Sequence, residues 1–353
     1  MAMEIGIIEG LYTQSPWNWA DRNRYAEFCR DKGAAYYLYA PKNDIYLREN
    51  WRENWPPALL APLQAFRRHL RECGVAFGIG FTPYRVEQLD PVTRQALAAR
   101  MTQINEALEP DVLCVAFDDF VSKMPELAQR QVEIAEYLAG LSCAKRFFIV
   151  GSYYSKDPLL QRTYGPMPEG YWHDLGRIGP GFDIFWTGQH VISLGHDPEE
   201  LAQMAGFFGR KPYLWDNWPV NDPAWLHNRL PLFAIPGRPW QLQDSVRGLA
   251  ANPMTQPNLS QIPLSTLFDI FALREDYQPR RAYLKALREY CGERLAQVVD
   301  DNLPYLVYEG RDSFSDFTRQ RLLKAFGAFT TETEKRFTTE IIAWINAPCG
   351  KRA

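Results

Sequence analysis

Short, almost continuously apolar segments alternate with longer amphipathic stretches along most of the chain. Continuous apolar runs, without the strict alternation of a half-exposed strand, are typical of strands buried on both faces of a parallel sheet. The expected strands are 4–9, 34–39, 75–80, 111–117, 146–150, 183–187, 212–216 and 246–251. Eight strands that alternate with helices over about 275 residues predict an α/β fold, a (β/α)8 barrel of the TIM type.

Amphipathic stretches with ordinary helix start and stop signals lie between the first five strands. The expected helices are 20–32, 60–73, 91–108 and 124–141, the last one starting after Ser122 with Pro125 in its first turn. Two further helical stretches follow the last strand, at 278–299 and at 314–346, and the second is broken near Gly327. We therefore expect a barrel domain over 1–300 and a small helical C-terminal appendage over 301–353.

The composition narrows the range of partners. Lys and Arg number 39 against 42 Asp and Glu, a net charge of −3, and a chain without a basic excess is not expected to bind nucleic acid. Apolar runs such as 112–117 are far shorter than the roughly 20 residues that a membrane helix needs. Aromatic residues make up 14% of the chain and include 11 Trp, which suits a pocket that stacks on the flat apolar faces of sugars. Nothing in the sequence indicates an oligomeric state.

Cysteine usage and the N-terminus bear on the compartment. The six cysteines are irregularly spaced and form no Cys-x-x-Cys pair, which favours free thiols over disulfides or a zinc ribbon. The chain enters a strand pattern almost at once and shows neither the basic nor the apolar region of a signal peptide. We therefore expect a cytoplasmic protein.

A pair of carboxylates, Asp118 and Asp119, follows the fourth expected strand directly. The active site of such a barrel lies at the carboxyl ends of its strands. Neighbouring strand residues point to opposite faces, so both carboxylates reach one pocket only if the strand pattern breaks there. Such a pair raises one pKa and leaves one group as a general acid beside an ionised partner. A helix cap, solvated loop acids and a divalent-metal site remain open alternatives.

Other polar and aromatic residues gather at the remaining strand ends. They are Gly10, Lys42, Tyr154, Thr187, Trp215, Asn217, Asp222 and Asn252. Taken singly, each has an ordinary structural explanation, such as a solvated charge, barrel-mouth packing or a tight turn. The five histidines have no zinc-ligand spacing, and the chain contains no dinucleotide, Walker or nucleophile-elbow motif. No metal or organic cofactor is expected.

Taken together, the strand ends resemble the catalytic domain of glycoside hydrolase family 84, which comprises O-GlcNAcases and bacterial β-N-acetylglucosaminidases, some with hyaluronidase-like annotation. The likeness covers roughly residues 4–275 in the family's order. Its segments are Glu9-Gly10-Leu11-Tyr12 with Pro16-Trp17, Tyr39-Ala40-Pro41-Lys42, Phe117-Asp118-Asp119, Trp186-Thr187-Gly188 with Val191-Ile192-Ser193, Leu214-Trp215-Asp216-Asn217 with Asn221-Asp222, and Asn252-Pro253. Departures from the family pattern are Leu11, Thr13 and the segment Gly151-Ser152-Tyr153-Tyr154.

The resemblance implies a retaining β-N-acetylglucosaminidase in which the substrate's own acetamido oxygen forms an oxazoline intermediate. It implies that Asp118 orients the acetamido group, and that Asp119 protonates the leaving oxygen and then activates water. Gly10 and Lys42 would bind the 3-hydroxyl region, and Asp222 and Asn252 the 4- and 6-hydroxyls. The acetamido pocket would be lined by Tyr154, Thr187, Val191, Trp215 and Asn217. The implied partner is a glycan or glycoconjugate that contains N-acetylglucosamine.

Two other functions fit the same residues. A metal-dependent barrel hydrolase would use Asp118, Asp119 and Asp222 as oxygen ligands. A non-catalytic glycan-binding barrel would keep the pocket without turnover.

Overall fold

The computed structural model describes residues 3–13, 16–121 and 124–348, and contacts divide the chain into two compact units. Unit 1 comprises Met1–Gly10, Ala26–Asn217 and Gln241–Asn252. Unit 2 comprises Leu11–Tyr25, Trp218–Trp240 and Pro253–Ala353. The expected division into a barrel over 1–300 and a helical appendage over 301–353 stays a prediction.

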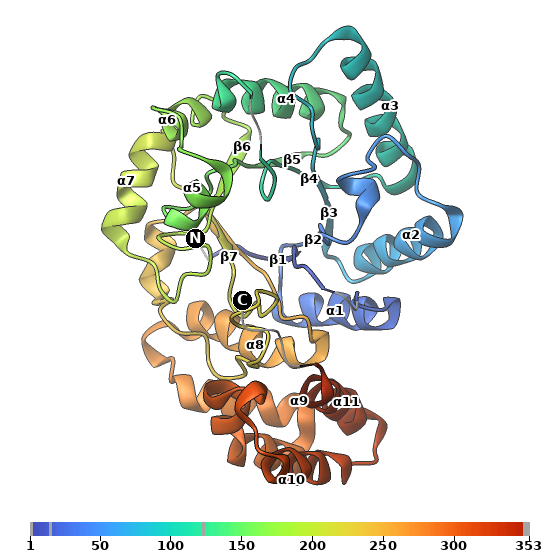
Figure 1. Cartoon of the computed structure of the whole chain (residues 1–353), viewed down its shortest axis with the longest axis vertical. Coiled ribbons are helices and arrows are strands. Elements are labelled where there is room, and N and C mark those ends of the chain that lie inside the picture. The colour runs from blue at the N-terminus through green and yellow to red at the C-terminus, as the bar shows by residue number, and fades with distance from the viewer. Residues whose placement is uncertain (1–2, 14–15, 122–123, 349–353) are drawn as a thin grey trace. The chain divides into compact units, whose positions relative to one another are not determined.

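Unit 1 contains a closed barrel of eight parallel strands in the order β1 to β8 (Figure 1). The strands are β1 (Ile5–Glu9), β2 (Tyr36–Tyr39), β3 (Ala76–Phe81), β4 (Val112–Ala116), β5 (Arg146–Val150), β6 (Phe182–Trp186), β7 (Tyr213–Asp216) and β8 (Gly248–Ala251). The ring closes where β1 pairs with β8, with Ile5 opposite Leu249. Each strand lies within two residues of its expected range at both ends, and the predicted (β/α)8 barrel is confirmed.

Helices connect successive strands, and Figure 1 shows α2, α3, α4, α6 and α7 around the ring. The helices up to β8 are α1 (Trp19–Lys32), α2 (Pro57–Glu72), α3 (Pro91–Leu108), α4 (Leu127–Leu141), α5 (Pro158–Tyr164), α6 (Tyr171–Leu175) and α7 (Pro198–Phe208). Two 3-10 turns, Ile45–Leu47 and Trp240–Asp244, accompany them. The expected start of α4 at residue 124 is wrong, because Glu126 adopts a left-handed backbone with φ 51° and the helix begins only after it. Ser122 lies outside the described residues.

Aromatic rings fill the barrel interior near the amino ends of the strands. Phe148 stacks on Phe185 with ring centroids 4.5 Å apart, and Tyr36 packs against Phe148 at 5.5 Å. Gly6 gives this layer its room, since a Cβ there would lie 2.3 Å from the Tyr36 ring. The Arg146 guanidinium covers the Phe148 ring at 4.7 Å. Side chains therefore fill the amino end of the barrel, and a ligand-binding site is expected at the carboxyl ends of the strands.

Unit 2 is built mainly from the helices that follow β8. These are α8 (Pro257–Leu273), α9 (Pro279–Asp301), α10 (Asp316–Gly327) and α11 (Glu332–Asn346), with short turns at Arg274–Asp276, Pro304–Glu309 and Arg311–Ser313. Their apolar faces share one buried core that includes Leu287, Leu322 and Ile341. The stretch expected as 314–346 forms α10 and α11, and α9 contains a kink at Gly292. The expected helices of the C-terminal region are thus present.

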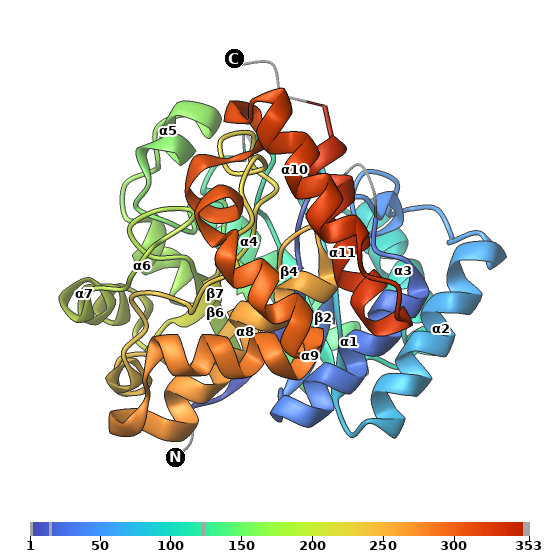
Figure 2. The same ribbon diagram turned by 90° about the horizontal axis from the view of Figure 1, so that it is seen from below.

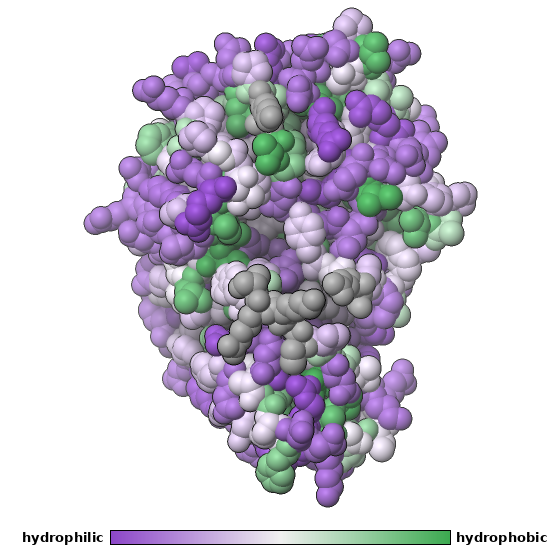
Figure 3. Space-filling view, viewed as in Figure 1, coloured by the Kyte–Doolittle hydropathy of each residue, from purple (hydrophilic) through white to green (hydrophobic). Residues whose placement is uncertain are grey.

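On the face drawn in Figure 3, polar side chains cover most of the area and apolar ones form separate patches. Within the described residues, no helix combines the length and apolar character that crossing a bilayer requires. The five described cysteines are free, four of them buried and Cys143 exposed, whereas Cys349 lies outside the described residues.

Candidate active site

The two aspartates after β4 point to one place because the backbone changes conformation between them. β4 is buried along its whole length and ends at Ala116. Asp119 adopts a left-handed backbone with φ 60°, which is uncommon for a residue other than glycine. The turn breaks the strand alternation, so both carboxylates reach the same ammonium group. The two side chains therefore converge, as the sequence analysis requires if both carboxylates are to reach one pocket.

That ammonium belongs to Lys42, in the loop after β2. Its Nζ forms an ion pair with Oδ2 of Asp118 and lies 3.3 Å from Oδ2 of Asp119. The same Nζ lies 5.7 Å from the centroid of the Trp215 ring. Arg48 is also buried and acts electrostatically on Lys42 and Asp119. Two cations therefore face two carboxylates, and this balance allows three buried charged groups to lie beside the half-buried Asp119.

One oxygen of Asp118 has a different environment from the other. Oδ2 is paired with Lys42, whereas Oδ1 is buried and has no hydrogen-bond partner among the residues that the structure describes. A buried carboxylate oxygen without a donor is costly, by roughly 1–3 kcal/mol or more. Buried polar atoms of native structures usually have a hydrogen-bond partner, and the N–H of a bound ligand could be the donor to this oxygen.

Asp119 is surrounded by donors. Its Oδ1 accepts hydrogen bonds from the hydroxyls of Tyr154, at 3.1 Å, and Tyr164, at 3.2 Å. Burial raises the pKa of Asp119, but Lys42, Arg48 and the Tyr154 hydroxyl outweigh it and hold this pKa below its usual value. A close carboxylate pair alone predicts a raised pKa for one member. At Asp119 that expectation is wrong in this arrangement, because two cations stabilise the ionised form.

A chain of hydrogen bonds joins five of the predicted residues into one wall. The backbone N–H of Gly10 donates to Oδ1 of Asn252 at 3.1 Å, and Nδ2 of Asn252 donates to Oδ1 of Asn217 at 2.9 Å. The indole N–H of Trp215 donates to the same Asn217 oxygen at 2.9 Å, and Nδ2 of Asn217 donates to the carbonyl of Val191 at 2.8 Å. A Cβ on Gly10 would lie 2.3 Å from the Trp215 ring, so only glycine fits beside this indole.

Thr187 and Asp222, the other two predicted residues, lie in different units. The backbone N–H of Thr187 donates to the carbonyl of Tyr154 at 3.0 Å, which ties the ends of β6 and β5 together. Asp222 belongs to unit 2, where its Oδ2 accepts a 2.6 Å hydrogen bond from the backbone N–H of Tyr12. Ten of the eleven predicted residues thus lie in unit 1, and Asp222 lies in unit 2.

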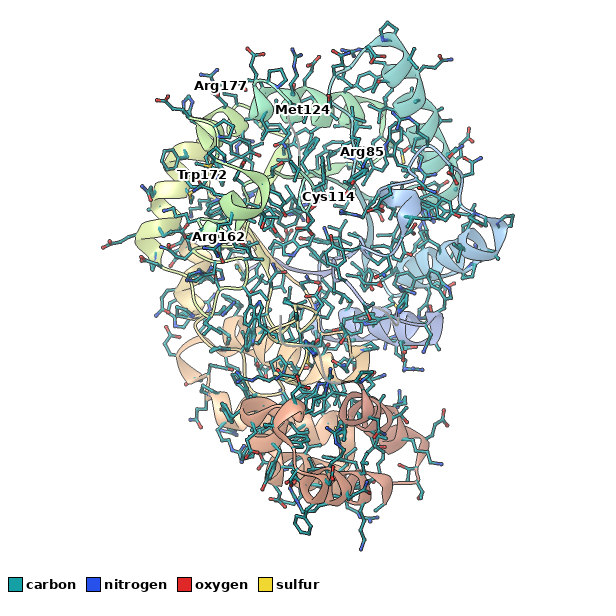
Figure 4. The ribbon with its side chains drawn as sticks, viewed as in Figure 1. Arg85, Cys114, Met124, Arg162, Trp172 and Arg177 are labelled. Atoms are coloured by element: carbon teal, nitrogen blue, oxygen red, sulfur yellow. The ribbon has the colours of Figure 1, made fainter. Side chains whose placement is uncertain are left out.

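Arg48 and Tyr164 belong to the site but follow from no sequence signal. Arg48 comes directly after the short turn Ile45–Leu47, and Tyr164 is the last residue of α5. A small cavity beside Lys42 is lined by Arg48, Cys114 and Trp215, among others. Figure 4 marks Cys114 within the ring of strands. Neither residue stands at a strand end, which is where the sequence predicts the residues of the site.

Metal ligands were one of the alternatives for the carboxylates. In the part of the chain that the structure describes, no group of three or more His, Cys, Asp or Glu side chains is arranged to hold a metal ion. In unit 1 the nearest cation to both Asp118 and Asp119 is the Lys42 ammonium.

Comparison with known proteins adds to this geometry. The model of the beta-N-acetylglucosaminidase family matches residues 5–303. The sequences named protein O-GlcNAcase from Rattus norvegicus and Mus musculus are each 26% identical over 281 residues, which covers 74% of this chain and 29% of theirs. The chain therefore spans less than a third of the length of these curated relatives.

Solved structures share the fold. An O-GlcNAc hydrolase mutant from Thermobaculum terrenum is 24% identical with a TM-score of 0.74, over 96% of this chain and 75% of that one. The protein CpGH84B is 20% identical with a TM-score of 0.76, over 97% of this chain and 66% of that one. The family match covers most of the chain, including the whole barrel, and the chain belongs to the beta-N-acetylglucosaminidase family, glycoside hydrolase family 84.

Proposed function

We propose that the chain is a retaining β-N-acetylglucosaminidase that hydrolyses terminal β-linked N-acetylglucosamine through an oxazoline intermediate. The substrate is a glycan or glycoconjugate that carries this sugar. Family membership supports the substrate class, and the paired aspartates at the carboxyl end of β4 support the reaction type. The reaction needs no metal or organic cofactor.

The observation that carries this proposal is the buried Oδ1 of Asp118, which has no donor among the described residues. An acetamido N–H is a suitable donor for it. A charged acceptor on this N–H turns the acetamido oxygen toward the anomeric carbon and stabilises the positive charge that develops on the amide as that oxygen attacks. Lys42 holds the other oxygen of Asp118 and fixes the carboxylate for this role.

The reaction then proceeds in two displacements. The acetamido oxygen forms a bond to the anomeric carbon while the bond to the leaving oxygen breaks, and the leaving oxygen takes a proton from Asp119. Water next attacks the anomeric carbon and opens the oxazoline ring, and Asp119 removes a proton from this water. Two inversions at one carbon give net retention.

Asp119 must carry a proton for the first displacement, although the contacts described above favour its ionised form. A bound sugar removes water from the site, and its 3-hydroxyl takes hydrogen bonds from Lys42. Both changes raise the pKa of Asp119, because they weaken the stabilisation of its charge. Sugar binding thus prepares the acid, and proton uptake from solvent accompanies it.

The remaining residues recognise the sugar. Gly10 and Lys42 bind the 3-hydroxyl region, and Asn252 binds the 4- and 6-hydroxyls. The acetamido pocket is formed by Tyr154, Thr187, Val191, Trp215 and Asn217. Sites that hydrogen-bond substrate hydroxyls in this way discriminate strongly against analogues that lack them.

The test is a series of 4-methylumbelliferyl β-glucosaminides whose N-acetyl group carries zero to three fluorine atoms. Fluorine weakens the acetamido oxygen as a nucleophile, so kcat/KM should fall steeply along the series, and proton NMR should show the β-anomer as the first product. A rate that does not respond to fluorine, or the α-anomer first, would overturn the mechanism. Rates with and without EDTA test the metal-dependent alternative, and sugar binding without turnover would identify a binding module.

A further inference from the structure

Two tyrosine hydroxyls meet on a single oxygen of Asp119. Tyr154 and Tyr164 both donate to Oδ1, at 3.1 and 3.2 Å, while Lys42 lies 3.3 Å from Oδ2. The two oxygens of this carboxylate therefore have different neighbours. Tyr154 comes from the loop after β5, whereas Tyr164 comes from α5, a short helix above α6 in Figure 2.

Local contacts hold Tyr164 in place. Asp157 caps the start of α5 by accepting from the N–H of Leu159 at 2.9 Å, and Gly165 ends the helix with φ 94°. The hydroxyl of Tyr153 donates to the carbonyl of Gly165 at 2.9 Å, and its ring packs edge-on against Tyr164 at 6.4 Å. Arg162 of the same helix, labelled in Figure 4, is exposed. The helix thus presents one side chain to Asp119 from a fixed position.

We propose that Tyr164 is a positioning residue for the hydrolysis, which holds Oδ1 of Asp119 so that the transferred proton is carried on Oδ2. The inference rests on the proposed function, in which Asp119 is the general acid. An oxygen that already accepts two hydroxyl donors presents no free lone pair for the leaving group. Oδ2, once its contact with Lys42 is exchanged for the sugar, is the oxygen that can hold and deliver the proton.

Removal of the Tyr164 hydroxyl changes the pKa of Asp119 in a definite direction. Among the described residues, Lys42, Arg48, Tyr154 and Tyr164 act on Asp119, beside its chain neighbour Asp118. Burial and the charges of Asp119 and Asp118 raise the pKa of Tyr164, so its hydroxyl remains a donor. A donor to a carboxylate stabilises the ionised form, so its removal raises the pKa of Asp119. Because the acid must be protonated, activity falls as pH rises through that pKa.

The test is the pH profile of kcat for Tyr164→Phe, measured on an aryl β-N-acetylglucosaminide with a poor leaving group, because kcat reports the sugar complex in which Asp119 carries the proton. The alkaline limb should move to higher pH by about one unit, the size expected for loss of one hydrogen bond to a charged group. On the plateau, kcat should fall by about tenfold, because the acid is held less well. With a 2,4-dinitrophenyl leaving group, which departs without a proton, the loss should nearly vanish.

Tyr137→Phe is the matched control, since Tyr137 is also a half-buried tyrosine that donates one hydrogen bond, to the carbonyl of Arg94 at 3.0 Å. Its pH profile should match the wild type. An unmoved limb in Tyr164→Phe, or equal losses with both leaving groups, would overturn the inference. If Tyr164→Phe does not fold, Tyr164→Leu removes the same hydroxyl for the same measurement. Asp119→Asn separates the two proposals. Full activity in that variant contradicts the proposed function. An inactive Asp119→Asn together with an unshifted alkaline limb in Tyr164→Phe contradicts only this inference.

Discussion

The Nζ of Lys42 lies 3.3 Å from Oδ2 of Asp119. The same ammonium pairs with Asp118, so one cation joins two carboxylates that follow each other in the chain. This arrangement explains how two adjacent acids can lie side by side at a strand end, and it gives their oxygens different neighbours. It also makes the protonation of Asp119 depend on where Lys42 is bound, which links sugar binding to acid catalysis.

Asp119→Asn should remove the general acid and base while leaving the shape of the site intact. General acid–base catalysis contributes about 10²–10⁴-fold, so kcat/KM for a poor aryl leaving group should fall by that factor. Steady-state rates with a poor and an activated leaving group check this. The first displacement should be largely preserved for the activated substrate, and azide should speed the second one by replacing water. Equal losses with both substrates and no azide effect would argue against the assigned role.

Gly10→Ala should weaken sugar binding, because the added Cβ would meet the Trp215 ring at 2.3 Å. The indole must then move, and with it the hydrogen bond to Asn217 that orders the wall of the pocket. We expect KM to rise by about tenfold, since a small displacement of positioning groups is costly. Gly140→Ala is the matched control. Gly140 lies inside α4 with open space around its Cβ position, so alanine there should stabilise the fold by about 0.5–1 kcal/mol with unchanged KM.

Much of the fold was predictable from the chain because its strands are buried on both faces. β4 is an example, since an uninterrupted apolar run of this length is typical of a strand in a parallel sheet that is covered on both faces. α8 was not predicted, because it is buried over most of its length and so lacks an amphipathic pattern. Pro263 inside it also weakens the helix signal.

The site was predictable only where its residues follow strands. Asp118, Asp119 and Lys42 stand directly beyond β4 and β2, so topology alone brings them to one end of the barrel. Tyr164 reaches Asp119 from the far end of α5, and no pattern in the sequence fixes how that loop folds back. The joint ion pair with Lys42, which reverses the expected direction of the pKa of Asp119, depends on side-chain placement that spacing cannot give.

Glu340 should make the stability of unit 2 depend on pH. Its carboxylate accepts from the backbone N–H groups of Asn258 and Leu259, at 3.0 and 2.9 Å, and so caps the start of α8. Burial raises the pKa of Glu340 to about 7, with the Asp21 charge adding to the effect. A raised carboxyl pKa means that the folded state binds more protons between pH 4.5 and 7, so this contribution to stability is largest below pH 4.5 and declines as pH rises to 7.

Urea unfolding at pH 5 and pH 8 tests this in Glu340→Gln. Relative to the variant, the wild type should lose about 2 kcal/mol of unfolding free energy between the two pH values. Glu332 is an exposed residue in the first turn of α11, the helix that also carries Glu340, and Glu332→Gln should show the same pH dependence of stability as the wild type. Parallel pH dependences in the wild type and Glu340→Gln would show that Glu340 titrates like an ordinary surface carboxylate.

Asp118 is the residue on which substrate-assisted catalysis depends most, and one measurement tests its role directly. Wild type and Asp118→Asn are compared for hydrolysis of an aryl β-N-acetylglucosaminide and for inhibition by a thiazoline that mimics the oxazoline. Loss of the charged acceptor should lower kcat by about 10²–10³-fold and weaken inhibition by the thiazoline in parallel, because both depend on the same interaction. Wild-type turnover in Asp118→Asn, or thiazoline affinity that does not change with it, would contradict substrate-assisted catalysis at this site.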